Sequence, residues 1–221
     1  LRELAKVAKE HGKLVFVDAV SAMGAVELKV DEWGIDLVFA SSQKAFGVPP
    51  GLAMAAVSEE VFEKARRIPE RGLYFDLLEI KEFLNTQWST PTTPPIPIVA
   101  GLNAALRIVE KMGGKEAWLK MYAERAEKIR RGIIELGLQL FAEPGYYSPT
   151  ITVVYNPPGI KGPVIYEELR KKGIEIARGY GKVKDVTFRI GHMGYITDDD
   201  IKLLFEELRD VLANLGYRPR S

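Results

Sequence analysis

The 221-residue sequence contains no cysteine, which excludes disulfide bonds, thiolate metal ligands and a cysteine nucleophile within this chain. It also lacks a surplus of either charge, since 31 Lys and Arg residues stand against 30 Asp and Glu residues. Neither nucleic-acid binding nor an acidic tail is therefore indicated. Its only histidines, His11 and His192, lie too far apart in sequence to suggest a metal site. Abundant Lys, Glu and Arg without Cys is typical of heat-adapted proteins.

Long apolar runs are missing too. No segment approaches the length needed to cross a bilayer, and residues 1–12 form a charged, helix-like stretch without the apolar core of a signal peptide. We therefore expect a soluble, cytoplasmic protein that does not bind membranes.

Three short apolar runs lie at residues 13–20, 35–42 and 51–58, and the first is rich in β-branched residues. Each is typical of a strand buried on both faces of a parallel sheet. Helix-like segments at residues 1–12 and after residue 58 accompany them. Buried strands that alternate with connections and helices predict an α/β architecture.

The composition changes at residues 88–97, where WSTPTTPPIP contains four prolines and three threonines. Proline fixes φ and removes a backbone donor, so this segment is predicted to be an extended, ordered connector. Helices are expected at 98–112 and 115–136, followed by strand, helix, strand, strand and helix. The last helix is predicted at 196–216, capped by Thr197, with an apolar stripe that includes Leu203 facing the core. We therefore predict part of a large α/β domain, with a mainly parallel sheet, over residues 1–97 and a smaller α+β domain over residues 98–221.

Three residues occupy positions that suggest chemistry. Asp18 ends the first apolar run, where ligands bind in α/β sheets, although an Asp there is often only a turn former. Lys44 follows the second run within SSQKAFGVPPG, where a lysine can act as an amine nucleophile, although most lysines are solvated surface groups. Arg189 alternates with the apolar Phe188 and Ile190, which suits either carboxylate binding or a structural salt bridge.

The segment from FVDAV to SSQKAFGVPPG resembles the cofactor region of class V, fold-type I aminotransferases of the alanine–glyoxylate and serine–pyruvate group. These enzymes use pyridoxal 5′-phosphate (PLP). The resemblance implies that Asp18 pairs with the pyridine nitrogen and that Val20 packs against the cofactor ring. It also implies that Lys44 is the catalytic lysine that binds PLP covalently and that Gln43 contacts the phosphate.

Two later motifs extend the resemblance. TPTTPPI is similar to a segment whose threonine reaches the cofactor phosphate of the neighbouring subunit, which implies a homodimer in which Thr93, helped by Thr90, acts across the interface. FRIGHMG is similar to the strand whose arginine holds the substrate α-carboxylate, which implies that role for Arg189. The reaction implied is transamination between alanine or serine and glyoxylate or pyruvate.

The family's Gly/Ser phosphate turn and ring-stacking aromatic residue lie upstream of the helix at residues 1–12. We therefore expect this chain to be the C-terminal portion of the enzyme and a poor or inactive aminotransferase by itself. The alternatives are a non-catalytic folded fragment, a structural half of a split PLP enzyme, or another class V enzyme such as a phosphoserine aminotransferase. Cysteine desulfurases fit less well, because they need a cysteine and place His where this chain has Gln43.

Overall fold

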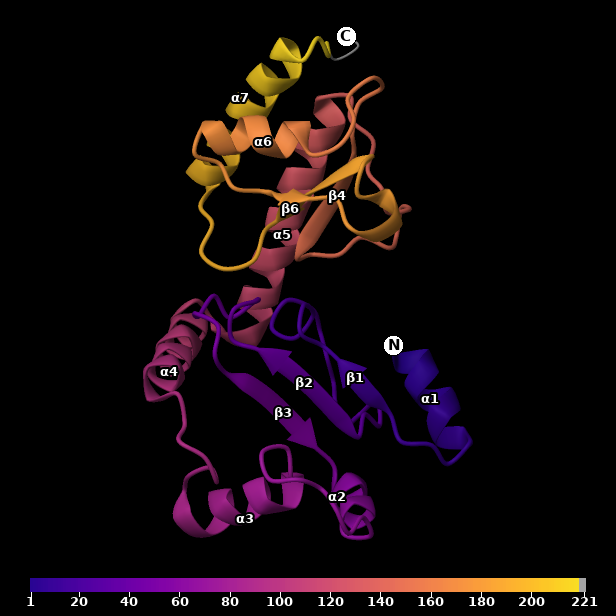
Figure 1. Ribbon diagram of the computed structural model, residues 1–221, viewed down its shortest axis with the longest axis vertical. Coiled ribbons are helices and arrows are strands. Elements are labelled where there is room, and N and C mark those ends of the chain that lie inside the picture. The colour runs from indigo at the N-terminus through magenta and orange to yellow at the C-terminus, as the bar shows by residue number, and fades with distance from the viewer. Residues whose placement is uncertain (219–221) are drawn as a thin grey trace. The chain divides into compact units, whose positions relative to one another are not determined.

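The computed structural model describes residues 1–218 and divides into two compact units, with the boundary between Lys111 and Met112. The first unit contains a three-stranded sheet in the order β1-β2-β3, and Figure 1 shows these strands side by side. Its elements are α1 (Arg2–Glu10), β1 (Phe16–Asp18), β2 (Leu37–Ser41), β3 (Ala53–Val57), α2 (Glu59–Ala65), α3 (Leu77–Gln87) and α4 (Ile96–Lys111).

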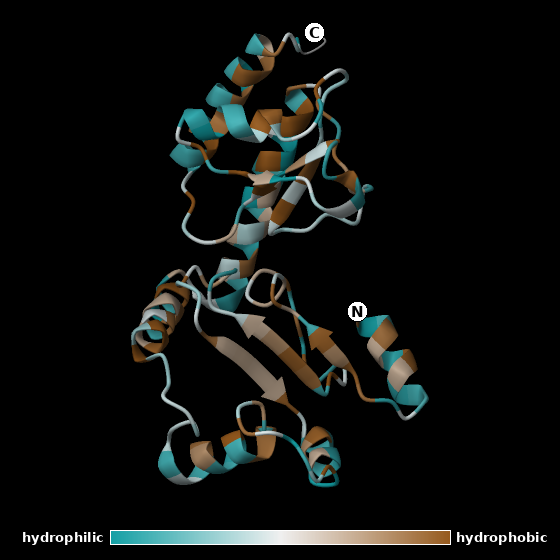
Figure 2. Ribbon diagram, viewed as in Figure 1, coloured by the Kyte–Doolittle hydropathy of each residue, from teal (hydrophilic) through white to brown (hydrophobic). Residues whose placement is uncertain are grey.

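The predicted strands form where expected, but two of their predicted properties are wrong. β1 pairs with β2 in parallel, whereas β3 pairs with β2 antiparallel, because Ser42 and Leu52 join the two strands through a local loop. The strands are also not buried on both faces: Phe16 is 60% exposed, and only β2 has fully buried residues. All three strands are largely hydrophobic in Figure 2. An apolar run thus predicted strand formation correctly but did not predict burial within this unit.

Asp36 holds several elements of the first unit together from a position just before β2. Its carboxylate accepts hydrogen bonds from Lys9 Nζ at 2.6 Å, from the Val15 backbone N–H at 2.8 Å and from Ser58 Oγ at 3.1 Å. These donors belong to α1, to the segment entering β1 and to the N-cap of α2. Burial alone would raise the pKa of Asp36, but these hydrogen bonds outweigh it and hold the pKa below its usual range.

The second unit packs two long helices and a short one around an antiparallel sheet in the order β4-β6-β5. Its elements are α5 (Gly114–Glu135), β4 (Ile151–Tyr155), α6 (Val164–Lys171), β5 (Ala177–Arg178), the 3-10 helix η1 (Gly181–Val183), β6 (Thr187–Gly191) and α7 (Asp198–Asn214). The core draws on every helix and on strands β4 and β6, and its fully buried members include Ile133, Val154, Ile165, Leu169 and Leu208.

The helices predicted from residue 98 onward are largely confirmed. Thr197 caps α7 as predicted, in a capping box with Asp200, and the helices at 98–112 and 115–136 correspond to α4 and α5 within two residues at each end. Phe188 and Ile190 are buried while Arg189 is partly exposed, as the predicted alternation requires. Leu203, expected in the core, is instead 49% exposed. Helix α3 has no buried residue and was not anticipated.

We predict that Asp36→Ala lowers the free energy of unfolding by about 2–3 kcal/mol at neutral pH, because the variant leaves buried donors without an acceptor. Asp31→Ala, which truncates an exposed aspartate, should change it by less than about 0.5 kcal/mol. Urea unfolding monitored by circular dichroism measures both.

The pH dependence provides a second check on Asp36. Its folded-state pKa lies below the unfolded value near 3.8, so its contribution is present above that value and is lost as the pH falls through the folded pKa. The stability difference between the wild type and Asp36→Ala should therefore shrink below about pH 4. A difference that is constant from pH 7 to pH 3 would contradict this account.

Candidate functional site

Asp18 and Lys44 follow the ends of two neighbouring parallel strands. In the register of β1 and β2, Asp18 lies opposite Phe39, and the Ala19 N–H donates to the Phe39 carbonyl at 3.0 Å. β2 ends two residues later at Ser41. Because parallel strands end at the same edge of a sheet, the segments that carry Asp18 and Lys44 leave the sheet side by side.

A buried serine orders the loop that carries Lys44. Ser42 is fully buried; its hydroxyl donates to the Pro49 carbonyl at 2.7 Å and accepts from the Leu52 N–H. Its backbone N–H donates to the Leu52 carbonyl, and its own carbonyl accepts from the Val48 N–H. Lys44 is partly buried on this loop, and its Nζ makes no hydrogen bond or ion pair within residues 1–218. The loop is therefore held while the amine stays available.

Gly24 brings the loop after Asp18 against the loop of Lys44. Its φ is +84°, and a Cβ at this position would lie 3.2 Å from Ala45 Cβ and 3.2 Å from Phe46 Cζ. A side chain would be both strained and crowded here. The contact joins the two loops directly after the two parallel strands.

The other polar side chains at this edge make few hydrogen bonds within the described part of the chain. The exposed carboxylate of Asp18 accepts one hydrogen bond, from the Val20 N–H at 3.0 Å, and Val20 itself is partly buried. Gln43 is exposed. The Ser41 hydroxyl is buried and has no hydrogen-bond partner in the described part of the chain, which is uncommon for a buried polar group.

Thr90 and Thr93 lie on the proline-rich connector between α3 and α4. Thr90 Oγ1 donates to the Thr92 carbonyl at 2.7 Å, while Thr93 is exposed. Neither threonine hydrogen-bonds to Asp18, Gln43 or Lys44 in the described residues. The structure thus gathers four predicted residues, Asp18, Val20, Gln43 and Lys44, at one sheet edge, but it does not join the two threonines to them within this chain.

Helix α4, which follows the connector, does pack against the Lys44 loop. A Cβ built on Gly101 would lie 3.0 Å from Val48 Cγ1, and one on Gly51 would lie 3.4 Å from Ile98 Cγ1. The connector therefore leads into a helix that contacts the loop of the candidate lysine.

Arg189 lies in the second unit, at the centre of β6. Its Nε donates to the Arg178 carbonyl at 2.7 Å, and its Cζ lies 5.7 Å from the centre of the Tyr180 ring. It forms no ion pair with any described carboxylate, so the structural salt bridge considered from the sequence is absent in this part of the chain.

The sequence did not reveal a buried polar group directly after Arg189. His192 is fully buried; its Nδ1 lies 2.9 Å from the Pro149 carbonyl and its Nε2 lies 3.0 Å from Thr152 Oγ1. Burial, with smaller effects from the positive Arg130 and Arg125, lowers the pKa of His192 from 6.5 to about 4, although the bond to Pro149 opposes the change. The single histidine in FRIGHMG did not indicate from the sequence that its side chain is buried and hydrogen-bonded.

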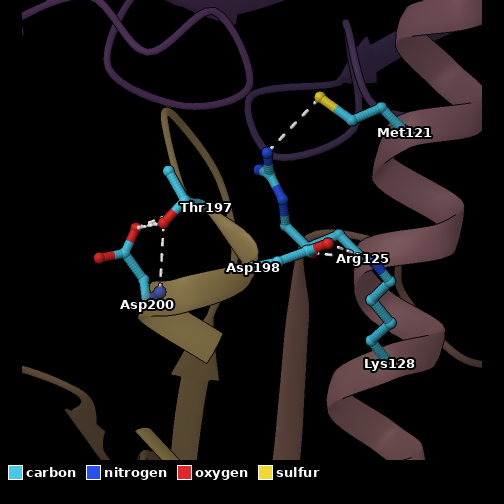
Figure 3. A network of polar contacts seen from close by, with 6 residues as sticks. All are labelled: Met121, Arg125, Lys128, Thr197, Asp198 and Asp200. Carbon is cyan, nitrogen blue, oxygen red and sulfur yellow. Dashed lines mark hydrogen bonds and ion pairs between the residues drawn. The ribbon is translucent and has the colours of Figure 1, made fainter. Parts of the chain in front are cut away.

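Helix α5 fixes the same segment from its other side. Arg125 Nη1 donates to the carbonyls of His192 and Gly194 at 3.1 and 2.9 Å. Figure 3 shows Arg125 and Lys128 extending from α5, with Lys128 paired to Asp198 at the start of α7 at 2.7 Å. Arg125 thus holds the start of the segment between β6 and α7, and Lys128 holds its end.

A metal-ligand cluster and a membrane-spanning helix are both absent from the described part of the chain. Within residues 1–218 no three His, Cys, Asp or Glu side chains gather as metal ligands would. No helix in the same part of the chain has the length and apolar content required to cross a bilayer.

Comparison with known proteins gives a consistent result. The family model for aminotransferase class-V matches residues 1–204. The soluble hydrogenase small subunit of Synechococcus sp. (strain PCC 6716) is 35% identical over 98% of this chain and 56% of that protein. The L-aspartate–glyoxylate aminotransferase of Paracoccus denitrificans is 31% identical over 95% of this chain and 53% of its own length.

Among solved structures, the ureidoglycine–glyoxylate aminotransferase of Bacillus subtilis superimposes with a TM-score of 0.89 at 29% identity. The match covers 100% of this chain and 58% of that one. The predicted fold class is thereby confirmed. The chain spans about half the length of the curated relatives that it matches.

We predict that His192 makes the protein less stable in mild acid. Its folded pKa near 4 lies below the unfolded value of 6.5, so the unfolded chain binds the proton first and stability falls as the pH drops from about 6.5 to about 4. The full loss is about 3 kcal/mol. His192→Asn should unfold in urea with a smaller loss between pH 7 and pH 4.5, whereas His11→Asn, at an exposed position, should match the wild type. Equal losses in all three proteins would refute the assignment.

Proposed function

Because the chain belongs to the class-V aminotransferase family, we propose that it forms the part of an aminotransferase that binds PLP and the substrate carboxylate. Enzymes of this family depend on PLP. The reaction we propose moves an amino group between alanine or serine and glyoxylate or pyruvate. Glyoxylate as the acceptor is supported by the names of the Paracoccus and Bacillus relatives.

The observation that carries the proposal is the unpaired amine of Lys44 on an ordered loop, at the same sheet edge as the Asp18 carboxylate. A PLP enzyme needs these two groups together, one as the amine that holds the cofactor and one as the partner of its pyridine nitrogen. The unsatisfied hydroxyl of Ser41 at this edge also fits a polar ligand. We prefer transamination on these grounds to the hydrogen chemistry in the name of the Synechococcus relative.

In this proposal Lys44 has two roles. Its amine would hold PLP covalently, and Nζ would also serve as the base that takes the proton from the substrate Cα. Bound PLP supplies a sink for the electron pair that this proton leaves behind. The carboxylate of Asp18 keeps the pyridine nitrogen protonated, and Val20 packs against the ring.

The remaining residues bind the phosphate of the cofactor and the carboxylate of the substrate. Gln43, Thr90 and Thr93 donate to the cofactor phosphate, and Arg189 orients the amino acid through its α-carboxylate. Such orientation lowers the barrier because the Cα–H bond is presented to the base before the reaction begins.

Two other functions stay as alternatives. A non-catalytic structural role would leave Lys44 unmodified by PLP, and a phosphoserine aminotransferase would prefer a phosphorylated substrate. The cytoplasmic location expected from the sequence stays a prediction.

We predict that borohydride reduction of the PLP-loaded full-length protein attaches the pyridoxyl group to Lys44, because this amine makes no hydrogen bond or ion pair to any described residue. Peptide mapping by mass spectrometry locates the label. Lys44→Ala should lose the label and transamination activity, whereas Lys13→Ala, which removes an exposed lysine, should keep both. A pyridoxyl group on another lysine would overturn the proposal, and no label at all would favour the structural alternative.

We also propose a homodimer, supported by the apolar surface of residues 68–112. Helices α3 and α4 contain no fully buried residue, and Figure 2 shows hydrophobic positions along both. Trp88, 92% exposed with a left-handed φ of 53°, ends α3 directly before the connector. Many exposed apolar side chains in one part of the sequence, with an exposed tryptophan among them, are typical of a protein interface. The exposed large apolar residues of this surface are Ile68, Leu73, Tyr74, Phe75, Leu84, Trp88, Ile96, Val99, Leu106, Ile108 and Met112.

A hybrid dimer tests whether Thr93 acts across this interface. Thr93→Ala alone should weaken PLP binding about 10- to 100-fold, because one hydrogen bond to a charged phosphate is lost. When Thr93→Ala and Lys44→Ala subunits are co-expressed with different tags, the purified hybrid should contain one PLP site of wild-type affinity. That site combines Lys44 of one subunit with Thr93 of the other. If the hybrid contains no such site, Thr93 acts within its own chain, and if Thr93→Ala alone leaves PLP affinity unchanged, Thr93 does not bind the phosphate.

A further inference from the structure

Arg189 is a partly buried cation that has no anionic partner among residues 1–218. On its face of the sheet, the residues paired with it are Val153 of β4 and Ala177 of β5, neither of which is charged. By contrast, the partly buried Arg130 of the same unit pairs with Glu127 at 3.0 Å. A guanidinium removed from water on an uncharged surface favours an anionic ligand.

The hydrogen bond to Arg178 restricts how such an anion can bind. A guanidinium can grip a carboxylate through Nε and one terminal nitrogen, or through its two terminal nitrogens. Nε of Arg189 is already occupied by the Arg178 carbonyl, whereas Nη1 and Nη2 make no hydrogen bond to any described residue. A carboxylate that binds bidentately must therefore use the two terminal nitrogens.

Tyr180 lies against the face of the same guanidinium. The ring centre is 5.7 Å from Arg189 Cζ, within the range of a cation–π interaction, although Tyr180 is 77% exposed. An exposed aromatic residue is held in place only if its backbone is held.

The backbone around Tyr180 is indeed fixed by close packing. A Cβ on Gly179 would lie 2.5 Å from the Thr187 carbonyl oxygen and 2.7 Å from the Lys184 carbonyl oxygen, so only glycine fits between these groups. The Thr187 hydroxyl, itself buried, donates to the Val183 carbonyl at 2.8 Å and ties η1 to β6. Tyr180 is thus attached to the strand that carries Arg189.

We propose that Tyr180 is a positioning residue for the substrate carboxylate. Its ring and the Arg178 carbonyl fix the plane of the Arg189 guanidinium and leave the edge with the two terminal nitrogens for the α-carboxylate of an amino or 2-oxo acid. This inference rests on the proposed function, in which Arg189 binds that carboxylate. It adds a second side chain that tunes affinity for the carboxylate without touching the reacting atoms.

The test compares substitutions at Tyr180 in the full-length enzyme. Tyr180→Ala should raise KM about two- to fivefold with kcat unchanged, the effect expected of an exposed cation–π contact, and Tyr180→Phe should restore the wild-type KM because it keeps the ring. Tyr146→Ala removes an equally exposed tyrosine elsewhere in the unit and should change neither constant. The melting temperature and the amount of bound PLP should be the same in all four proteins.

A binding measurement separates affinity from catalysis. Propanoate, which cannot react, is titrated while the NMR resonance of the Arg189 Nε–H group is followed. The Kd of propanoate should rise in Tyr180→Ala by the same factor as KM. In the Arg189→Lys background, which lacks the planar fork, Tyr180→Ala should have no further effect on KM.

The outcomes distinguish the two proposals. If Arg189→Lys leaves kcat/KM unchanged, Arg189 does not bind the carboxylate and that part of the proposed function is wrong. The role of Tyr180 is wrong, while the proposed function stands, if Arg189→Lys lowers kcat/KM but Tyr180→Ala does not change KM. The same holds if Tyr180→Ala changes KM equally in the wild-type and Arg189→Lys backgrounds. A fall in melting temperature in Tyr180→Phe as well as in Tyr180→Ala would assign Tyr180 to stability and also overturn the inference.

Discussion

The parallel pairing of β1 with β2 is the constraint on which the candidate site depends. A parallel register makes two strands end at one edge, so Asp18 and Lys44 are neighbours although 26 positions separate them in the sequence. The contact of Gly24 with Ala45 and Phe46 then fixes the two loops against each other. At the start of the same strands, Asp36 joins α1, the segment before β1 and the cap of α2. The candidate site at one end of the strands thus depends on the hydrogen-bonded carboxylate of Asp36 at the other end.

The second unit uses a related arrangement around Arg189. One neighbour in sequence, Phe188, is buried in the core, and the residues that follow β6 are held by Arg125 and by the buried His192. The strand therefore cannot rotate or slip without breaking both packing and hydrogen bonds. The residue that we propose for carboxylate binding thus lies where packing and hydrogen bonds restrict the backbone.

Periodicity and turn chemistry were sufficient to predict the strands, the capped helix at Thr197 and the placement of Asp18 and Lys44 after apolar runs. They were not sufficient for the direction of β3, because an apolar run does not encode whether its partner is parallel. His192 and Tyr180 were missed for a different reason. Their roles depend on Thr152, Pro149 and Arg189, contacts made through folding rather than by local spacing. Helix α3 was missed although Leu77, Ile80 and Leu84 recur at helical spacing in its sequence, and this apolar stripe is not buried within the chain.

The ordered loop around Ser42 has an entropic consequence. Fixing the backbone of one flexible residue costs about 1–2 kcal/mol, so a disordered segment over residues 43–51 would oppose ligand binding by on the order of 10 kcal/mol. Because Ser42 ties the two ends of this loop together during folding, that cost is met before any cofactor arrives. What remains to be immobilised is the side chain of Lys44, at about 2 kcal/mol. If Lys44 binds the cofactor as proposed, a single buried hydroxyl thereby moves most of the entropic cost of binding into folding.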